Sequence, residues 1–160
     1  MKLDRLSRML EEVGVREGIS DLRFGHENRA VMPLAGGLRL CFEYNEAADL
    51  LFLHMSVIEL VAAPAQRCAM LETMLSLNFL KLGTGKGELS LQQQGTQAVY
   101  QIGLPTAALN VDRLNGEIKR FLAQHRECRQ ALEDVALPAM PSAVLTRANG
   151  HAELLRRLAR

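Results

Sequence analysis

The stretch from Pro64 to Leu104 constrains the fold most, because the spacing of its apolar residues changes partway along. In its first part, apolar residues recur at every third or fourth position, which is typical of one face of an α-helix. The glycines between Gly83 and Gly87 then predict the end of that helix. After them, apolar and polar residues alternate, and the polar segment 92–96 divides this part into two strands. The stretch therefore predicts a helix followed by a β-hairpin.

The residues before this stretch predict one more helix and a group of strands. Gly14 is expected to end the first helix. A short strand near residues 30–34 is confined to a sheet edge by Pro33, which has no N–H group for an interior ladder. Two longer strands are predicted at residues 38–44 and 50–61. The apolar face of the first helix consists of Leu3, Leu6, Met9, Leu10 and Val13.

The residues after the hairpin predict a long last helix. Asn110 is a suitable N-cap, and Pro138 ends the helical pattern. The order helix, strands, helix, strands, helix predicts an α+β fold, in which helices pack against a twisted antiparallel sheet. We expect one domain over residues 1–137 and a tail over residues 138–160 with a short basic helix. The stripe of the last helix consists of Leu114, Ile118, Phe121, His125, Cys128 and Leu132.

Composition excludes several classes of protein. Apolar residues make up 48% of the 160 residues, enough for one buried core. The formal charge of +1 predicts no nucleic-acid or membrane partner, and no apolar run approaches the roughly 20 residues that span a bilayer. Aromatic residues are only 4%, which argues against a base-stacking surface. The N-terminus lacks the apolar core of a signal peptide, so we expect a cytoplasmic protein.

No motif predicts catalysis, a cofactor or a metal site. The glycine-rich stretch Gly83–Gly87 departs from a phosphate-binding loop, since Gly87 stands where that loop needs a hydroxyl residue and the stretch follows a helix. The histidines and cysteines lack metal-ligand spacing. The cysteines, which we expect to be reduced packing residues, are Cys41, Cys68 and Cys128.

Two apolar features each leave two interpretations open. Met70 and Met74 lie one helical turn apart, and either fill the core or form an adaptable contact surface. The strand from Leu50 is apolar on both faces, so Leu50 and Phe52 point away from the side that meets the helices. They either bind an extended client, or are covered by another layer or a dimer mate.

The stretch Met70–Asn78, its glycine-containing loop, Gly87–Leu91 and Val99–Pro105 resemble the class I effector chaperones of type III secretion systems. In that family a leucine-rich helix ending near an Asn precedes a Gly-led hairpin, and a long final helix with an aromatic residue such as Phe121 follows. The order of elements matches from about Leu3 to Leu132.

The resemblance implies a homodimer without enzyme activity. It also implies binding of the N-terminal segment of a secreted effector in extended form, which keeps the effector secretion-competent and directs it to the export apparatus, with the export ATPase as a further partner. The implied dimer interface lies on the central helix, through Met70, Leu71, Met74, Leu75 and Asn78. The candidate effector-binding residues are Leu6, Met9, Leu50 and Phe52.

Two alternative functions remain open from the sequence. The first is a small adaptor that binds RNA or an anionic surface through the basic tail, and its binding would weaken steeply with salt. The second is a small enzyme built on a cysteine, which would need a thiol with a perturbed pKa.

Overall fold

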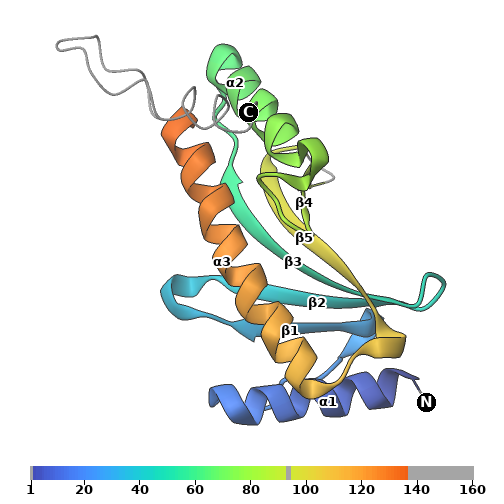
Figure 1. Ribbon diagram of the computed structural model, residues 1–160. Helices are drawn as coiled ribbons and strands as arrows, with labels where there is room; N and C mark the ends of the chain where they lie inside the picture. Colours follow the sequence, from blue (N-terminus) through green and yellow to red (C-terminus); the bar gives the residue numbers. More distant parts are fainter. Residues whose placement is uncertain (1, 93–94, 137–160) are drawn as a thin grey trace.

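A computed structural model describes residues 2–92 and 95–136, and in this part of the chain three α-helices pack against one antiparallel sheet (Figure 1). The order of the five strands is β1-β2-β3-β5-β4, which places β1 and β4 at the edges. The predicted α+β class is confirmed. The helices are α1 (Lys2–Glu17), α2 (Pro64–Asn78) and α3 (Val111–Ala136), and the strands are β1 (Arg29–Pro33), β2 (Arg39–Asn45), β3 (Leu50–Glu59), β4 (Glu88–Leu91) and β5 (Gln97–Pro105).

Strand β3 lies at the centre of the sheet and pairs with β2 on one side and β5 on the other. Its residues alternate between the two faces, as a period of two requires. Leu51, Leu53 and Met55 are buried on the face that the helices cover, whereas Leu50 and Phe52 are half-buried on the opposite face. The predicted orientation of Leu50 and Phe52, away from the helices, is confirmed.

Helix α3 runs across the sheet and contacts β3, β5 and both other helices (Figure 1). The predicted cap is present, because the backbone N–H of Arg113 donates to Asn110 Oδ1 at 2.8 Å. The predicted stripe is buried along its whole length, from Leu114 to Leu132. Burying such apolar side chains stabilises the fold by about 1.5–3 kcal/mol each. Helix α3 is therefore the main helical wall of the core.

Two helix ends differ from the sequence prediction. Helix α1 passes through Gly14 and ends beside Gly18, whose φ of 71° suits a left-handed cap. Gly14 instead allows close packing, since a Cβ there would lie 2.8 Å from the carbonyl oxygen of Ile19.

Helix α2 ends at Asn78 rather than at Gly83, and the short 3₁₀ turn η3 (Phe79–Lys81) follows. Leu80 and Lys81 adopt positive φ angles of 50° and 59°, which residues other than glycine rarely do. Gly83 still contributes to the end of the helix, because its N–H donates a hydrogen bond to the carbonyl oxygen of Leu77 in the last turn at 3.1 Å.

Candidate functional site

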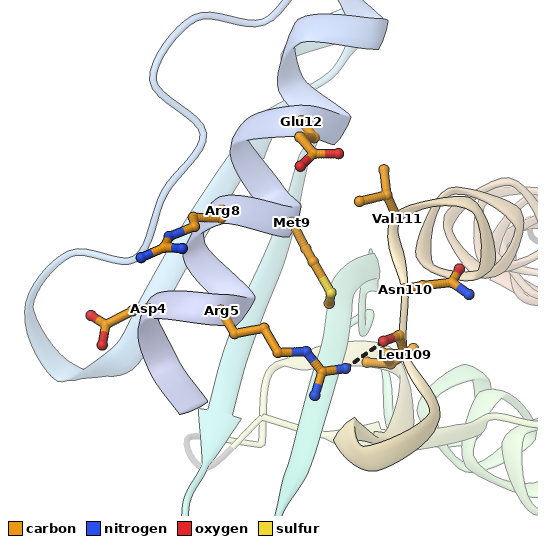
Figure 2. A pocket seen from close by; sticks show the side chains of 8 residues that line it. All are labelled: Asp4, Arg5, Arg8, Met9, Glu12, Leu109, Asn110 and Val111. Atoms are coloured by element: carbon orange, nitrogen blue, oxygen red, sulfur yellow. Dashed lines mark hydrogen bonds between the residues drawn. The ribbon is translucent and has the colours of Figure 1, made fainter. Parts of the chain in front are cut away.

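An open groove of about 540 Å³ lies between α1 and the beginning of α3 (Figure 2). Its floor is apolar, with Met9 from α1 facing Leu109 and Val111. Arg5 donates a hydrogen bond to the carbonyl oxygen of Leu109, and this bond holds the far wall in place. Charged residues of α1 also line the groove. They are Asp4, Arg8 and Glu12.

The structure separates the two candidate effector-binding residues of α1. Met9 lines the groove, although most of its surface is buried. Leu6 is only 2% exposed and belongs to the hydrophobic core behind the groove. Of these two residues, Met9 is thus the one that a bound chain could contact directly, while Leu6 lies in the core.

The other candidate pair lies on the outer face of the sheet, away from the helices. Phe52 stands opposite Gly103 of β5 and Glu43 of β2 in the strand register. A Cβ on Gly103 would come 3.2 Å from the Phe52 ring and 3.6 Å from Leu50, so both side chains lie over bare backbone. The pair is therefore partly covered within the subunit and is still open to a partner. It lies on the other side of the sheet from the groove.

The candidate dimer face of α2 divides into an inner and an outer part. Met70 and Met74 are buried inside the subunit, which supports the core interpretation of these methionines, and Leu71 is half-buried against the core. Leu75, by contrast, is 70% exposed. Asn78 is half-buried and its carboxamide binds the backbone of Leu89. Only Leu75 among these five presents a large apolar side chain to solvent.

More exposed apolar residues follow Leu75 along the chain, and sequence reasoning missed most of them. Seven large apolar residues are exposed in the described part of the chain, and five of them fall between Leu75 and Leu91. The run of apolar residues just before Gly83 was the available signal. We call these residues together the exposed apolar cluster. It consists of Leu75, Phe79, Leu80, Leu82 and Leu91.

Two of the three cysteines lie in surroundings that disfavour the thiolate form. Burial raises the pKa of Cys128 to about 11 and also raises the pKa of Cys41, so both thiols stay protonated at neutral pH. Cys68 is exposed on α2, so the packing role predicted for it is wrong. Within residues 2–92 and 95–136, no group of three His, Cys, Asp or Glu side chains is placed to hold a metal ion.

The glycine-rich loop is attached to α3 rather than open for a phosphate group. Gln124 donates to the carbonyl oxygen of Gly83 at 2.8 Å. The ammonium group of Lys86 lies 3.0 Å from the buried carboxylate of Glu117. The cation that a phosphate site would need is thus already paired.

The fold is of the α+β class. Comparison with known proteins identifies the family. The model of the Tir chaperone protein (CesT) family matches residues 8–129, and the chain belongs to this family. It is a type III secretion chaperone, a class of protein that binds effectors. A search of curated protein sequences found no match.

Solved structures of secretion chaperones share this fold. A chain in the crystal structure of the ExsC–ExsE complex has a TM-score of 0.69 at 13% identity, covering 81% of this chain and 95% of that one. A chain of the HopA1–SchA chaperone–effector complex has a TM-score of 0.61 at 19% identity, covering 78% of this chain and 93% of that one. A chain of the ExoU–SpcU complex from the type III secretion system of Pseudomonas aeruginosa has a TM-score of 0.56 at 17% identity, covering 81% of this chain and 96% of that one. None of the helices in residues 2–92 and 95–136 has the length and apolar character needed to cross a bilayer.

Proposed function

We propose that the protein acts in the bacterial cytoplasm as a homodimer that holds the N-terminal segment of a secreted effector in extended form. The bound effector stays secretion-competent and is delivered to the export apparatus, including the export ATPase. The family membership supports this function, and so does the resemblance to the HopA1–SchA chaperone–effector complex.

The proposal that the effector segment is bound in extended form rests on the positions of the two candidate apolar surfaces. The groove beside Met9 lies among the helices, whereas Leu50 and Phe52 lie on the other face of the sheet. A compact ligand could not contact both surfaces of one subunit. An extended chain that passes around the edge of the sheet can contact both, and it buries apolar side chains along its path.

Strand β1 is an edge around which such a chain could pass. Val31, at its middle, is 48% exposed. In an antiparallel strand, alternate residues direct both N–H and C=O away from the paired neighbour. A client strand beside Val31 would gain backbone hydrogen bonds as well as apolar contacts.

The exposed apolar cluster supports the dimer. Monomeric soluble proteins rarely leave a patch of large apolar side chains uncovered. A second copy related by a twofold axis would place the same residues against one another and remove them from water. Leu75 lies in this cluster, whereas Met70 and Met74 are buried inside the subunit.

The client surface can be tested with Phe52→Glu, using the effector that co-purifies from the native cell as ligand. Burying an unpaired carboxylate against the client should weaken binding at least about 100-fold, or about 2.7 kcal/mol. The circular dichroism spectrum and the dimer mass should stay unchanged. Ser56→Glu is the matched control, because it adds the same charge at an exposed position on the same strand. Normal binding by Phe52→Glu, or loss of its fold, would overturn the assignment of this face.

The alternative adaptor function depends on residues 138–160, which lie outside the described residues. No contact in the described part of the chain favours it.

A further inference from the structure

The two edges of the sheet differ in how their outward backbone groups are bonded. Edge strands present unpaired N–H and C=O groups, to which any extended polypeptide can add. In this sheet the edges are β1 and β4. The difference between them bears on where a client strand can pair.

At the β4 edge, the side chain of Asn78 takes the place of a neighbouring strand. Its Nδ2 donates to the carbonyl oxygen of Leu89 at 2.9 Å, and its Oδ1 accepts from the N–H of Leu89 at 2.8 Å. The N–H of Gln92 donates to the carbonyl oxygen of Gln97 on β5, so Gln92 directs its backbone groups toward β5. In an antiparallel ladder every second residue does so, and Leu89, three residues earlier, therefore directs its N–H and C=O away from β5. The carboxamide therefore satisfies the pair of groups that an added strand would use.

The closure of this edge extends to Gly87, the residue two positions before Leu89. The N–H of Gly87 donates to the carbonyl oxygen of Thr84 at 3.0 Å. Its own carbonyl oxygen accepts from Lys81 Nζ at 2.9 Å. Lys81 lies in η3 with a positive φ, so the turn after α2 brings both Asn78 and Lys81 to the strand. A strand added at this edge would have to displace the hydrogen bonds of both Gly87 and Leu89.

The β1 edge has no comparable closure around Val31. The N–H of Leu34 donates to the carbonyl oxygen of Leu38, so Leu34 directs its backbone groups toward the paired strand. Because such residues alternate along the strand, Val31, three residues earlier, directs its N–H and C=O away from β2. Of the outward backbone groups of β1, the carbonyl of Arg29 is the one that is bonded within residues 2–92 and 95–136, by the N–H of Gly25 at 2.8 Å. Among the described residues, neither backbone group of Val31 has a partner beyond its strand.

We propose that Asn78 is a specificity-determining residue, whose carboxamide closes the β4 edge to extended polypeptides and leaves β1 as the edge at which a client strand adds. This inference rests on the proposed function for the identity of the client. The closure itself concerns any extended chain, including a second copy of this protein. Asn78 is the last residue of α2, so its rigid helix holds the amide in register with Leu89.

The closure can be tested without a client, so its failure would leave the proposed function standing. Asn78→Leu removes the carboxamide at similar volume. Hydrogen exchange of the Leu89 amide should become several-fold faster, and sedimentation across the micromolar range should show a species heavier than the wild type. Adding Leu91→Pro, which removes the next outward N–H, should reverse the association. Asn110→Ala is the control, because it removes another Asn backbone bond far from β4.

Asn78→Asp supplies an independent test that does not depend on the leucine variant folding. Below the pKa of its new carboxyl group, a protonated acid can both donate and accept, as the amide does. Above that pKa the carboxylate has no donor, so association should increase with pH in this variant and not in the wild type. Unchanged Leu89 protection in a folded Asn78→Leu, wild-type mass at every concentration, or no pH-dependent association of Asn78→Asp would overturn the proposal.

Discussion

Helices α2 and α3 both carry apolar residues at helical spacing, yet they use them differently. Every stripe residue of α3 from Leu114 to Leu132 is buried. In α2, Met70 and Met74 are buried, whereas Leu75 is 70% exposed. Helix α3 lies across the sheet and contacts α1, α2, β3 and β5, while α2 packs against α3 and the edge strand β4 (Figure 1). An apolar stripe on a helix is thus buried in the core where the sheet and other helices cover it. Where they do not cover it, its apolar residues stay exposed and available for contact with a partner.

The comparison predicts a large difference in stability between matched truncations. Phe121 is 1% exposed and its ring centroid lies 4.9 Å from that of Tyr100. Phe121→Ala should lower the free energy of unfolding by about 3–5 kcal/mol, since it removes a fully buried ring and leaves a cavity. Leu75→Ala should change the stability of the isolated subunit by less than about 0.5 kcal/mol. Urea unfolding of both variants at low protein concentration measures the difference, and similar losses would break the comparison.

The second prediction concerns association. Leu75→Asp places a charge within the exposed apolar cluster, where a second subunit would have to bury it. The dimer dissociation constant should rise at least about 100-fold, or about 2.7 kcal/mol, without a change in the circular dichroism spectrum. Sedimentation equilibrium measures the constant, with exposed Glu72→Asp on the same helix as control. Wild-type protein that sediments as a monomer at micromolar concentration would contradict this assignment.

The smallest expected effect is a pH dependence that arises from α3. His125 is 1% exposed, and its Nε2 lies 2.8 Å from the carbonyl oxygen of Ser56. Burial lowers the pKa of His125 below its usual 6.5, and the Ser56 contact only partly offsets this. Below that usual value the unfolded chain binds a proton that the folded chain does not, so stability should fall as pH decreases, by at most about 1.4 kcal/mol per pH unit.

His125→Gln should reduce this slope, as measured by urea unfolding between neutral and mildly acidic pH. Burial also lowers the pKa of His54, so His54→Gln serves as the comparison for a half-exposed group on the sheet. An unchanged slope in His125→Gln would show that α3 does not cause the pH dependence.

The elements with regular apolar spacing were predictable from the sequence. The strands, the stripe of α3 and the cap at Asn110 need only local rules of period and capping, and the structure confirms them. The end of α1 was predicted wrongly, because Gly14 serves close packing that depends on the loop after the helix. Local sequence cannot distinguish a glycine that ends a helix from one that permits contact.

The sites depend on which layers cover each face, and spacing alone does not determine this. The sequence placed Met70 and Leu75 on one helical face, but only packing shows that one is buried and the other exposed. The pairing of Asn78 with Leu89 joins residues across a turn whose positive φ angles at Leu80 and Lys81 have no glycine signal. The roles of these residues in dimerisation and client binding stay predictions.

The most direct test of client binding in extended form is hydrogen exchange of the full-length protein, alone and with the N-terminal segment of its co-purified effector. The Val31 amide has no partner beyond its strand among the described residues, and we expect its exchange to slow when the effector binds. The Leu89 amide, already bonded to Asn78, should not change. Unchanged exchange at Val31, or new protection along β4 instead, would contradict strand addition at the β1 edge.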